Sequence, residues 1–94
     1  MIKSIKHKGL QLFIETGSKK LTQDQHSKKL LQLLLFLDAV DNLEDIKLNP
    51  KYRHSLKGDL SGFHSMTISG NWRLIFLFEN SNVYLVDYLD YHGK

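Results

Sequence analysis

The sequence contains no cysteine, which excludes a disulfide framework, a thiolate metal site and a cysteine nucleophile. It has one proline, and its aromatic fraction of 11% is high for a disordered chain. The longest apolar run covers residues 33–37, far short of the roughly 20 residues that span a bilayer. No apolar core or small-residue cleavage site follows the basic N-terminus, so we expect no signal peptide. These absences favour a cytoplasmic protein with no membrane association.

Motifs for metal and nucleotide binding are also missing. No histidine pair stands at i, i+4 on a predicted helix, no HExxH occurs, and neither His54 nor His64 has a neighbouring carboxylate. The glycine-rich phosphate loops GxGxxG and GxxxxGK[ST] are absent as well. We therefore predict no metal and no other cofactor.

The 94 residues fit one domain covering residues 1–94, with 41% hydrophobic and 24% charged side chains. A chain of this size buries about 60% of its unfolded surface, which gives one core but no deep enclosed active site. Any functional site should therefore be a groove on the surface.

The net charge of +3 is unevenly distributed along the chain. Residues 1–31 hold seven lysines against Glu15 and Asp24, a balance of +5, whereas residues 32–50 have a balance of −3. A basic face favours contact with a phosphate backbone, although a solvated lysine-rich surface is the plainer alternative. The seven candidates for contact with RNA or the ribosome are Lys3, Lys6, Lys8, Lys19, Lys20, Lys28 and Lys29.

Apolar spacing predicts two helices in the first half of the chain. Leu10, Phe13 and Ile14 form one stripe over residues 8–16, and Gly17 is a suitable C-terminal cap. Residues 22–25 match a capping box, which predicts a second helix that runs to residues 40–42. Further apolar residues, among them Leu31 and Leu35, widen the stripe of the second helix and face either the core or a partner. Residues 43–46 suggest a short helical turn.

From residue 52 onward the apolar period changes to two, which predicts strands over residues 52–56, 63–69, 72–79 and 83–90. The Gly70-Asn71 pair predicts a hairpin turn. Alternation predicts one face of the last strand that holds Tyr84, Val86, Tyr88 and Asp90. The expected fold class is α+β, with the two N-terminal helices on one face of an antiparallel sheet and the other face concave and wet.

Cleavage of RNA needs no metal, because the 2′-hydroxyl can serve as the nucleophile. It needs a base for that hydroxyl, a cation for the phosphate and an acid for the leaving oxygen. Residues that can supply these roles are His54, Lys57, Arg73, Asp90, Tyr91 and His92. Each of them also has an ordinary interpretation as a surface, turn or strand-end residue, so only their combination favours catalysis.

Several segments resemble the HigB-type toxins of the RelE/ParE superfamily. These segments are "LKGDLSG" at residues 56–62, "GNWR" at residues 70–73 and the "DYH" ending at residues 90–92, together with stretches of residues 2–10 and 15–18. The resemblance implies a RelE-like, microbial-RNase-type fold with a curved sheet. It also implies ribosome-dependent cleavage of mRNA in the decoding A site, often at A-rich codons. The implied partner is a HigA-type helix-turn-helix antitoxin, through which the toxin is held on operator DNA indirectly.

By the same resemblance, the catalytic positions fall on His54, Lys57 and Arg73, and on the terminal residues 90–92. We expect His54 and His92 to share the base and acid roles, Lys57 and Arg73 to stabilise the phosphate, Asp90 to orient an imidazole and Tyr91 to stack on a base. Only two arginines are present, so lysines must make most ribosome contacts as point charges. The alternatives are a gyrase-poisoning member of the superfamily, a non-catalytic nucleic-acid-binding module and a catalytically inactive homologue.

Overall fold

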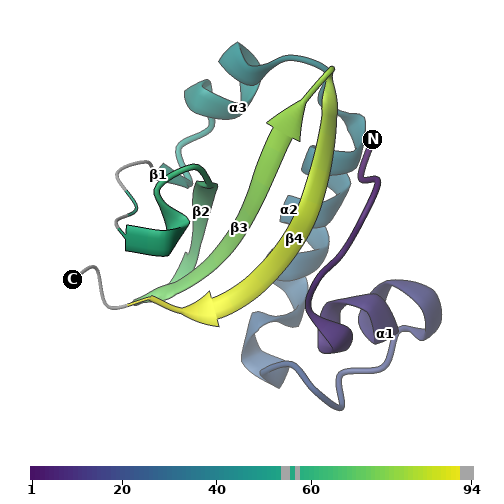
Figure 1. Cartoon of the computed structure of the whole chain (residues 1–94). Helices are drawn as coiled ribbons and strands as arrows, with labels where there is room; N and C mark the ends of the chain where they lie inside the picture. Colours follow the sequence, from purple (N-terminus) through teal and green to yellow (C-terminus); the bar gives the residue numbers. More distant parts are fainter. Residues whose placement is uncertain (54–55, 57, 92–94) are drawn as a thin grey trace.

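The computed structural model describes residues 1–53, 56 and 58–91. Within these residues four strands form one antiparallel sheet in the order β1-β2-β3-β4 (Figure 1). The elements in chain order are α1 (Lys8–Thr16), the 3-10 turn η1 (Asp24–His26), α2 (Ser27–Ala39), α3 (Leu43–Leu48), β1 (Tyr52–Arg53), the 3-10 turn η2 (Gly58–Leu60), β2 (His64–Ser69), β3 (Trp72–Glu79) and β4 (Asn82–Asp90).

Helix α1 has the predicted bounds because both of its ends are fixed locally. At its start, the Nδ1 atom of His7 accepts a hydrogen bond from the Leu10 N–H at 3.2 Å. At its end, Gly17 adopts a left-handed φ of 76° and its N–H donates to the carbonyl of Phe13. The prediction of the helix and its glycine cap is confirmed.

The start of the second helix was predicted wrongly. The Thr22 hydroxyl oxygen is buried without a hydrogen-bond partner in the described structure, so the capping box does not form. Instead the Gln23 N–H donates to the Tyr88 hydroxyl at 3.3 Å, and His26 is drawn into the core beside the same hydroxyl. This long-range contact folds the chain into η1, and α2 begins only at Ser27.

Helix α2 packs against the sheet, and it lies behind β3 and β4 in Figure 1. Leu10 of α1 joins the buried leucines of α2 and the sheet residues Met66, Leu74 and Val86 in one hydrophobic cluster. This arrangement confirms the α+β fold with the N-terminal helices packed on the sheet. The leucines of α2 in the cluster are Leu30, Leu33, Leu34 and Leu37.

Helix α3 is longer than the single turn suggested by the sequence. The Asn42 side chain accepts a hydrogen bond from the Asp45 N–H at 2.8 Å and caps the helix, and Ile46 is fully buried. The described residues therefore contain three α-helices, one more than the two that we predicted.

A bulge in β4 changes the predicted faces of that strand. The β3–β4 register shifts between Ile75 and Leu77, where Leu85 has a left-handed φ of 53°. Because of the extra residue, Val83 and not Tyr84 shares the core face with Val86. The prediction for Tyr84 was therefore wrong, since simple alternation does not anticipate a bulge.

The N-terminal segment runs along the outer edge of β4 (Figure 1). Single parallel bridges join Ile2 to Val83 and Ile5 to Val86. The Ser4 hydroxyl also accepts a hydrogen bond from the N–H of the strained Leu85 at 2.8 Å. This segment occupies backbone groups that an open sheet edge would leave unpaired.

The sheet face opposite α2 is only partly wet. The cross-strand row that contains Arg53, Ser65, Ile75 and Asp87 lies on this face. Ser65 is 0% exposed and Ile75 1% exposed, so the prediction of a solvated face is wrong at the centre of the row. Strand β1 is described only over Tyr52–Arg53, and residues 54 and 55 of the predicted strand lie outside the described residues.

Candidate functional site

Three of the six candidate catalytic residues can be placed. Arg73 lies near the start of β3, Asp90 ends β4 and Tyr91 follows it. The other three candidates, His54, Lys57 and His92, lie outside the described residues. The expected meeting of the two histidines therefore stays a prediction.

The Arg73 guanidinium is anchored through one of its nitrogens. Nη1 donates to the Thr67 hydroxyl at 3.0 Å and to the Gly70 carbonyl at 2.8 Å, with a longer contact of 3.4 Å to the Trp72 carbonyl. Nε and Nη2 make no hydrogen bond to the described part of the chain. The anchored side chain can thus offer two parallel N–H donors to a phosphate or carboxylate oxygen pair.

The hairpin between β2 and β3 creates this anchor. The β2–β3 register shifts between Thr67 and Ser69, and Gly70 adopts a left-handed φ of 56° in the turn. Thr67 stands directly opposite Arg73 in the register, which brings the hydroxyl within reach of the guanidinium. A side chain at Gly70 would strain this turn.

Register places Arg73 and Asp90 close in the backbone but on different faces. Asp90 pairs with Trp72, and its neighbour Leu89 pairs with Arg73. Because successive side chains in a strand alternate between faces, the Arg73 side chain leaves on the face away from α2 and the Asp90 side chain leaves on the face of Trp72. Their convergence on one face is therefore not supported by the register.

Tyr91 is tied to the same hairpin. Its backbone N–H donates to the Asn71 carbonyl at 2.8 Å, one residue beyond the end of β4. The "GNWR" segment and the start of the "DYH" segment are thus held side by side, although nearly twenty residues separate them in sequence. This contact fixes the point where the chain leaves the sheet toward residue 92.

Sequence reasoning missed a buried aromatic cluster beneath Arg73. His26 is 2% exposed, and its Nδ1 lies 2.6 Å from the Tyr88 hydroxyl. The Trp72 ring packs against the Tyr88 ring with centroids 4.8 Å apart and planes tilted by 31°, and it meets the His26 ring edge-on at 5.5 Å. The available signal was alternation in β3 and β4, which places Trp72 and Tyr88 on the core face, but nothing pointed to His26.

Burial sets the ionisation of this cluster. Desolvation, followed by the positive charge of Lys29, lowers the pKa of His26 below 6.5. Burial raises the pKa of Tyr88, so its hydroxyl stays protonated. The cluster is a neutral support for Trp72, the residue next to Arg73.

A second histidine is likewise held inside the fold. The His64 Nδ1 lies 2.8 Å from the Tyr52 hydroxyl, and burial together with the charge of Lys47 lowers the pKa of His64. In the described ranges there is no group of three or more His, Cys, Asp or Glu side chains that could hold a metal ion. His64 therefore has a packing role between β1 and β2.

The seven candidate lysines all have exposed side chains. They come from the N-terminal segment, α1, the following loop and α2, and Lys19 lies 3.5 Å from Asp24. Their exposure allows contact with a polyanion, but contact with RNA or the ribosome stays a prediction. No helix in the described part of the chain has the length and apolar character needed to cross a membrane.

Comparison with known proteins identifies the same family that the sequence motifs resemble. Residues 3–92 match the HigB-like toxin family, described as the RelE-like toxin of type II toxin–antitoxin system HigB. Endoribonuclease HigB of Proteus vulgaris is 37% identical over 92 residues, which cover 98% of this chain and 100% of that protein. The resemblance drawn from the motifs is confirmed, and the chain belongs to the HigB-like family of type II toxin–antitoxin toxins.

Proposed function

We propose that this toxin is an endoribonuclease that cleaves mRNA in the decoding A site of the ribosome. The observation that carries the proposal is the anchored Arg73 guanidinium beside the hairpin that holds Asp90 and Tyr91. The family match spans residues 3–92, and the relative from Proteus vulgaris is named an endoribonuclease.

The proposed reaction uses the 2′-hydroxyl of the RNA itself. One histidine of the pair His54 and His92 removes the 2′-hydroxyl proton, and the 2′-oxygen forms a bond to phosphorus. The bond from phosphorus to the 5′-oxygen breaks, and the other histidine supplies a proton to that oxygen. The products are a 2′,3′-cyclic phosphate and a 5′-hydroxyl end.

The cations of the site act on the phosphate in this mechanism. Arg73, already fixed through Nη1, presents its remaining N–H groups to the nonbridging oxygens as negative charge develops in the transition state. Lys57 adds a second positive charge. Since Arg73 does not have to be ordered during the reaction, its stabilising effect costs little conformational entropy.

The terminal residues position the reacting groups. Asp90 orients or tunes one imidazole, and Tyr91 stacks on a base of the message. The hydrogen bond from the Tyr91 N–H to Asn71 supports this role because it limits where the tyrosine can lie.

The ribosome supplies what a small open site lacks. A surface groove cannot align flexible mRNA with the catalytic groups, whereas the decoding site presents one codon in a fixed path. The exposed lysines dock the toxin on ribosomal RNA, and the complex acts in the cytoplasm. Outside the ribosome, a HigA-type helix-turn-helix antitoxin holds the toxin, and through that antitoxin the complex binds operator DNA.

The test compares mRNA in translating ribosomes with the same mRNA alone. Mapping of the RNA ends should show cuts within A-site codons only when ribosomes are present, and His92→Ala should abolish them without loss of folding. Intact mRNA in both reactions would contradict the proposal. A parallel DNA gyrase supercoiling assay should show no inhibition, and inhibition with intact mRNA would identify a gyrase poison instead.

A further inference from the structure

The Tyr88 side chain lies at the centre of the buried aromatic cluster and contacts three separate segments of the chain. Its ring meets the His7 ring edge-on with centroids 5.3 Å apart, the His26 ring at 6.0 Å and the Trp72 ring at 4.8 Å. Tyr88 is 4% exposed, so these contacts are made inside the fold. The three partners come from the end of the N-terminal segment, from η1 and from the start of β3.

Each of these three partners stands beside cationic residues in the sequence. His7 lies between two candidate lysines, two more begin two residues after His26, and Trp72 directly precedes Arg73. The four lysines are Lys6, Lys8, Lys28 and Lys29. One buried residue therefore contacts the chain neighbours of the candidate docking lysines and of the candidate catalytic arginine.

The Tyr88 hydroxyl connects η1 to the sheet through two hydrogen bonds. It accepts from the Gln23 N–H at 3.3 Å, and its own proton can be donated to Nδ1 of His26, 2.6 Å away. Burial lowers the pKa of His26 and keeps the imidazole neutral, so Nδ1 can accept this proton. Two lysine pairs bracket the connected residues, one before η1 and one after it. These η1 lysines are Lys19, Lys20, Lys28 and Lys29.

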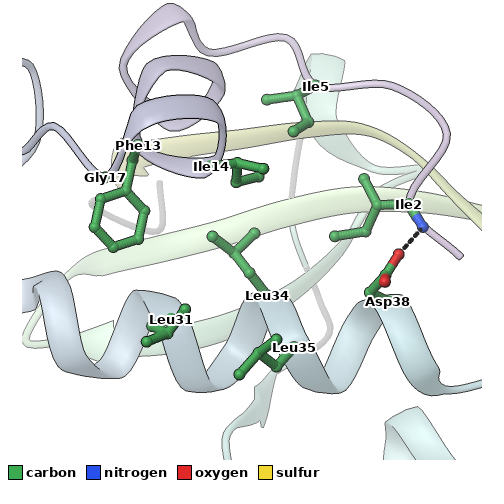
Figure 2. A pocket seen from close by; sticks show the side chains of 9 residues that line it. All are labelled: Ile2, Ile5, Phe13, Ile14, Gly17, Leu31, Leu34, Leu35 and Asp38. Atoms are coloured by element: carbon green, nitrogen blue, oxygen red, sulfur yellow. Dashed lines mark hydrogen bonds between the residues drawn. The ribbon is translucent and has the colours of Figure 1, made fainter.

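The N-terminal segment is held in place by contacts that do not involve the Tyr88 hydroxyl. At its start, the Ile2 N–H donates to the Asp38 carboxylate of α2 at 2.9 Å (Figure 2). At its end, the Lys6 N–H donates to the Val86 carbonyl of β4 at 2.8 Å. Removal of the hydroxyl should therefore release the η1 lysines and leave the lysines of the N-terminal segment in place.

We infer that Tyr88 is a positioning residue, which holds the η1 lysines in a fixed arrangement relative to Arg73. The inference rests on the proposed function, because it requires that these lysines dock on ribosomal RNA. A message fixed in the decoding site presents the ribosomal phosphates and the scissile phosphate at set positions, and the toxin must match both. A preformed arrangement meets this demand without the entropic cost of ordering the lysine segment during binding.

The test measures mRNA cleavage by the Tyr88→Phe variant at increasing ribosome concentration. The half-saturating concentration should rise about threefold or more, because loss of the hydroxyl lowers the fraction of toxin whose η1 lysines are placed for docking. The rate at saturating ribosomes should stay within about twofold, since the phenyl ring still packs against Trp72.

Salt dependence distinguishes positioning from simple damage to the fold. Affinity in the Tyr88→Phe variant should depend less steeply on salt concentration, because fewer lysines contact phosphates at the same time. A partly unfolded variant would instead show a lower saturating rate with the wild-type salt slope, and that result would overturn the inference.

Tyr52→Phe is the matched control. The Tyr52 hydroxyl forms a similar pair with Nδ1 of His64 at 2.8 Å, but it lies on β1, at the sheet edge opposite β4. Its half-saturating ribosome concentration and salt slope should therefore equal those of the wild type. If thermal unfolding shows that Tyr88→Phe does not fold, His26→Phe takes its place, because it removes the Nδ1 acceptor and keeps an aromatic ring.

Glutamate substitution of the η1 lysines separates the inference from the function on which it rests. This variant should lose ribosome affinity, and the loss should be smaller in the Tyr88→Phe background, where the lysines are already displaced. If the lysine variant loses affinity but Tyr88→Phe keeps the wild-type affinity and salt slope, the inference is overturned and docking by the lysines stands. If neither change alters affinity, the docking surface is wrong and the inference is overturned with it.

Discussion

The hydrogen bond between Thr67 and Arg73 should affect cleavage through the position of the guanidinium. Thr67→Val keeps the shape and strand preference of the side chain but removes the hydroxyl that accepts from Nη1 at 3.0 Å. The Gly70 carbonyl, 2.8 Å from the same nitrogen, still holds the side chain, so the guanidinium becomes looser and is not lost.

The size of the effect follows from one hydrogen bond. A net contribution of about 0.5–1.5 kcal/mol corresponds to a cleavage rate about 2- to 12-fold lower. The assay is single-turnover cleavage of a defined mRNA by ribosomes stalled with a chosen codon in the A site. Thr16→Val serves as a matched control, because its hydroxyl donates to the Leu12 carbonyl within α1, far along the chain from the hairpin.

A double-mutant cycle separates positioning from general damage to the fold. In an Arg73→Ala background, Thr67→Val should cause no further loss of rate, because the group that Thr67 positions is gone. Equal losses in both backgrounds, or no loss in the wild-type background, would refute the positioning role.

Three further outcomes are expected from the structure. Because the pKa of His26 is lowered in the folded protein, the unfolded chain binds more protons, and the free energy of unfolding should fall as pH drops below 6.5. Denaturant titrations should show that His26→Gln reduces the slope of the free energy of unfolding against pH by up to about 1.4 kcal/mol per pH unit. Part of the slope that remains should come from His64, whose pKa is also lowered. An unchanged slope in the variant would contradict a buried neutral His26. Leu30→Ala should destabilise the fold by about 2–5 kcal/mol in the same titrations, whereas Leu31→Ala on the exposed face should cost less than about 1 kcal/mol. Glutamate substitutions at Lys19, Lys20, Lys28 and Lys29 should weaken ribosome binding and flatten its salt dependence, and an unaltered salt slope would exclude this set as the docking surface.

Features set by local sequence were predictable, and features set by distant contacts were not. Both bounds of helix α1 were predicted correctly because their signals are local. The apolar stripe lies within the helix, and the capping residue Gly17 directly follows it. The start of α2 was missed because His26 contacts Tyr88, 62 positions along the chain. The faces of β4 were predicted wrongly because the strand bulges at Leu85, and no typical turn residue in the sequence indicates this bulge.

The candidate site shows the same division. The "GNWR" and "DYH" motifs identified the family, and the hairpin pattern brought Trp72 opposite Asp90. The anchor of Arg73 on Thr67 could not be foreseen, because it depends on the shifted register of β2 and β3. Alternation in β4 places the Asp90 side chain on the sheet face opposite to that of Arg73. The motif residues alone do not predict this difference.

The central claim is that the 2′-hydroxyl of ribosome-bound mRNA is the nucleophile. The most direct measurement replaces the ribonucleotide on the 5′ side of a mapped cut with its 2′-deoxy counterpart, leaves the rest of the message unchanged, and follows cleavage on programmed ribosomes. Cleavage at that linkage should stop, while unmodified message should yield 2′,3′-cyclic phosphate and 5′-hydroxyl ends. Undiminished cleavage of the deoxy-substituted linkage, or 5′-phosphate ends on the unmodified message, would contradict the central claim.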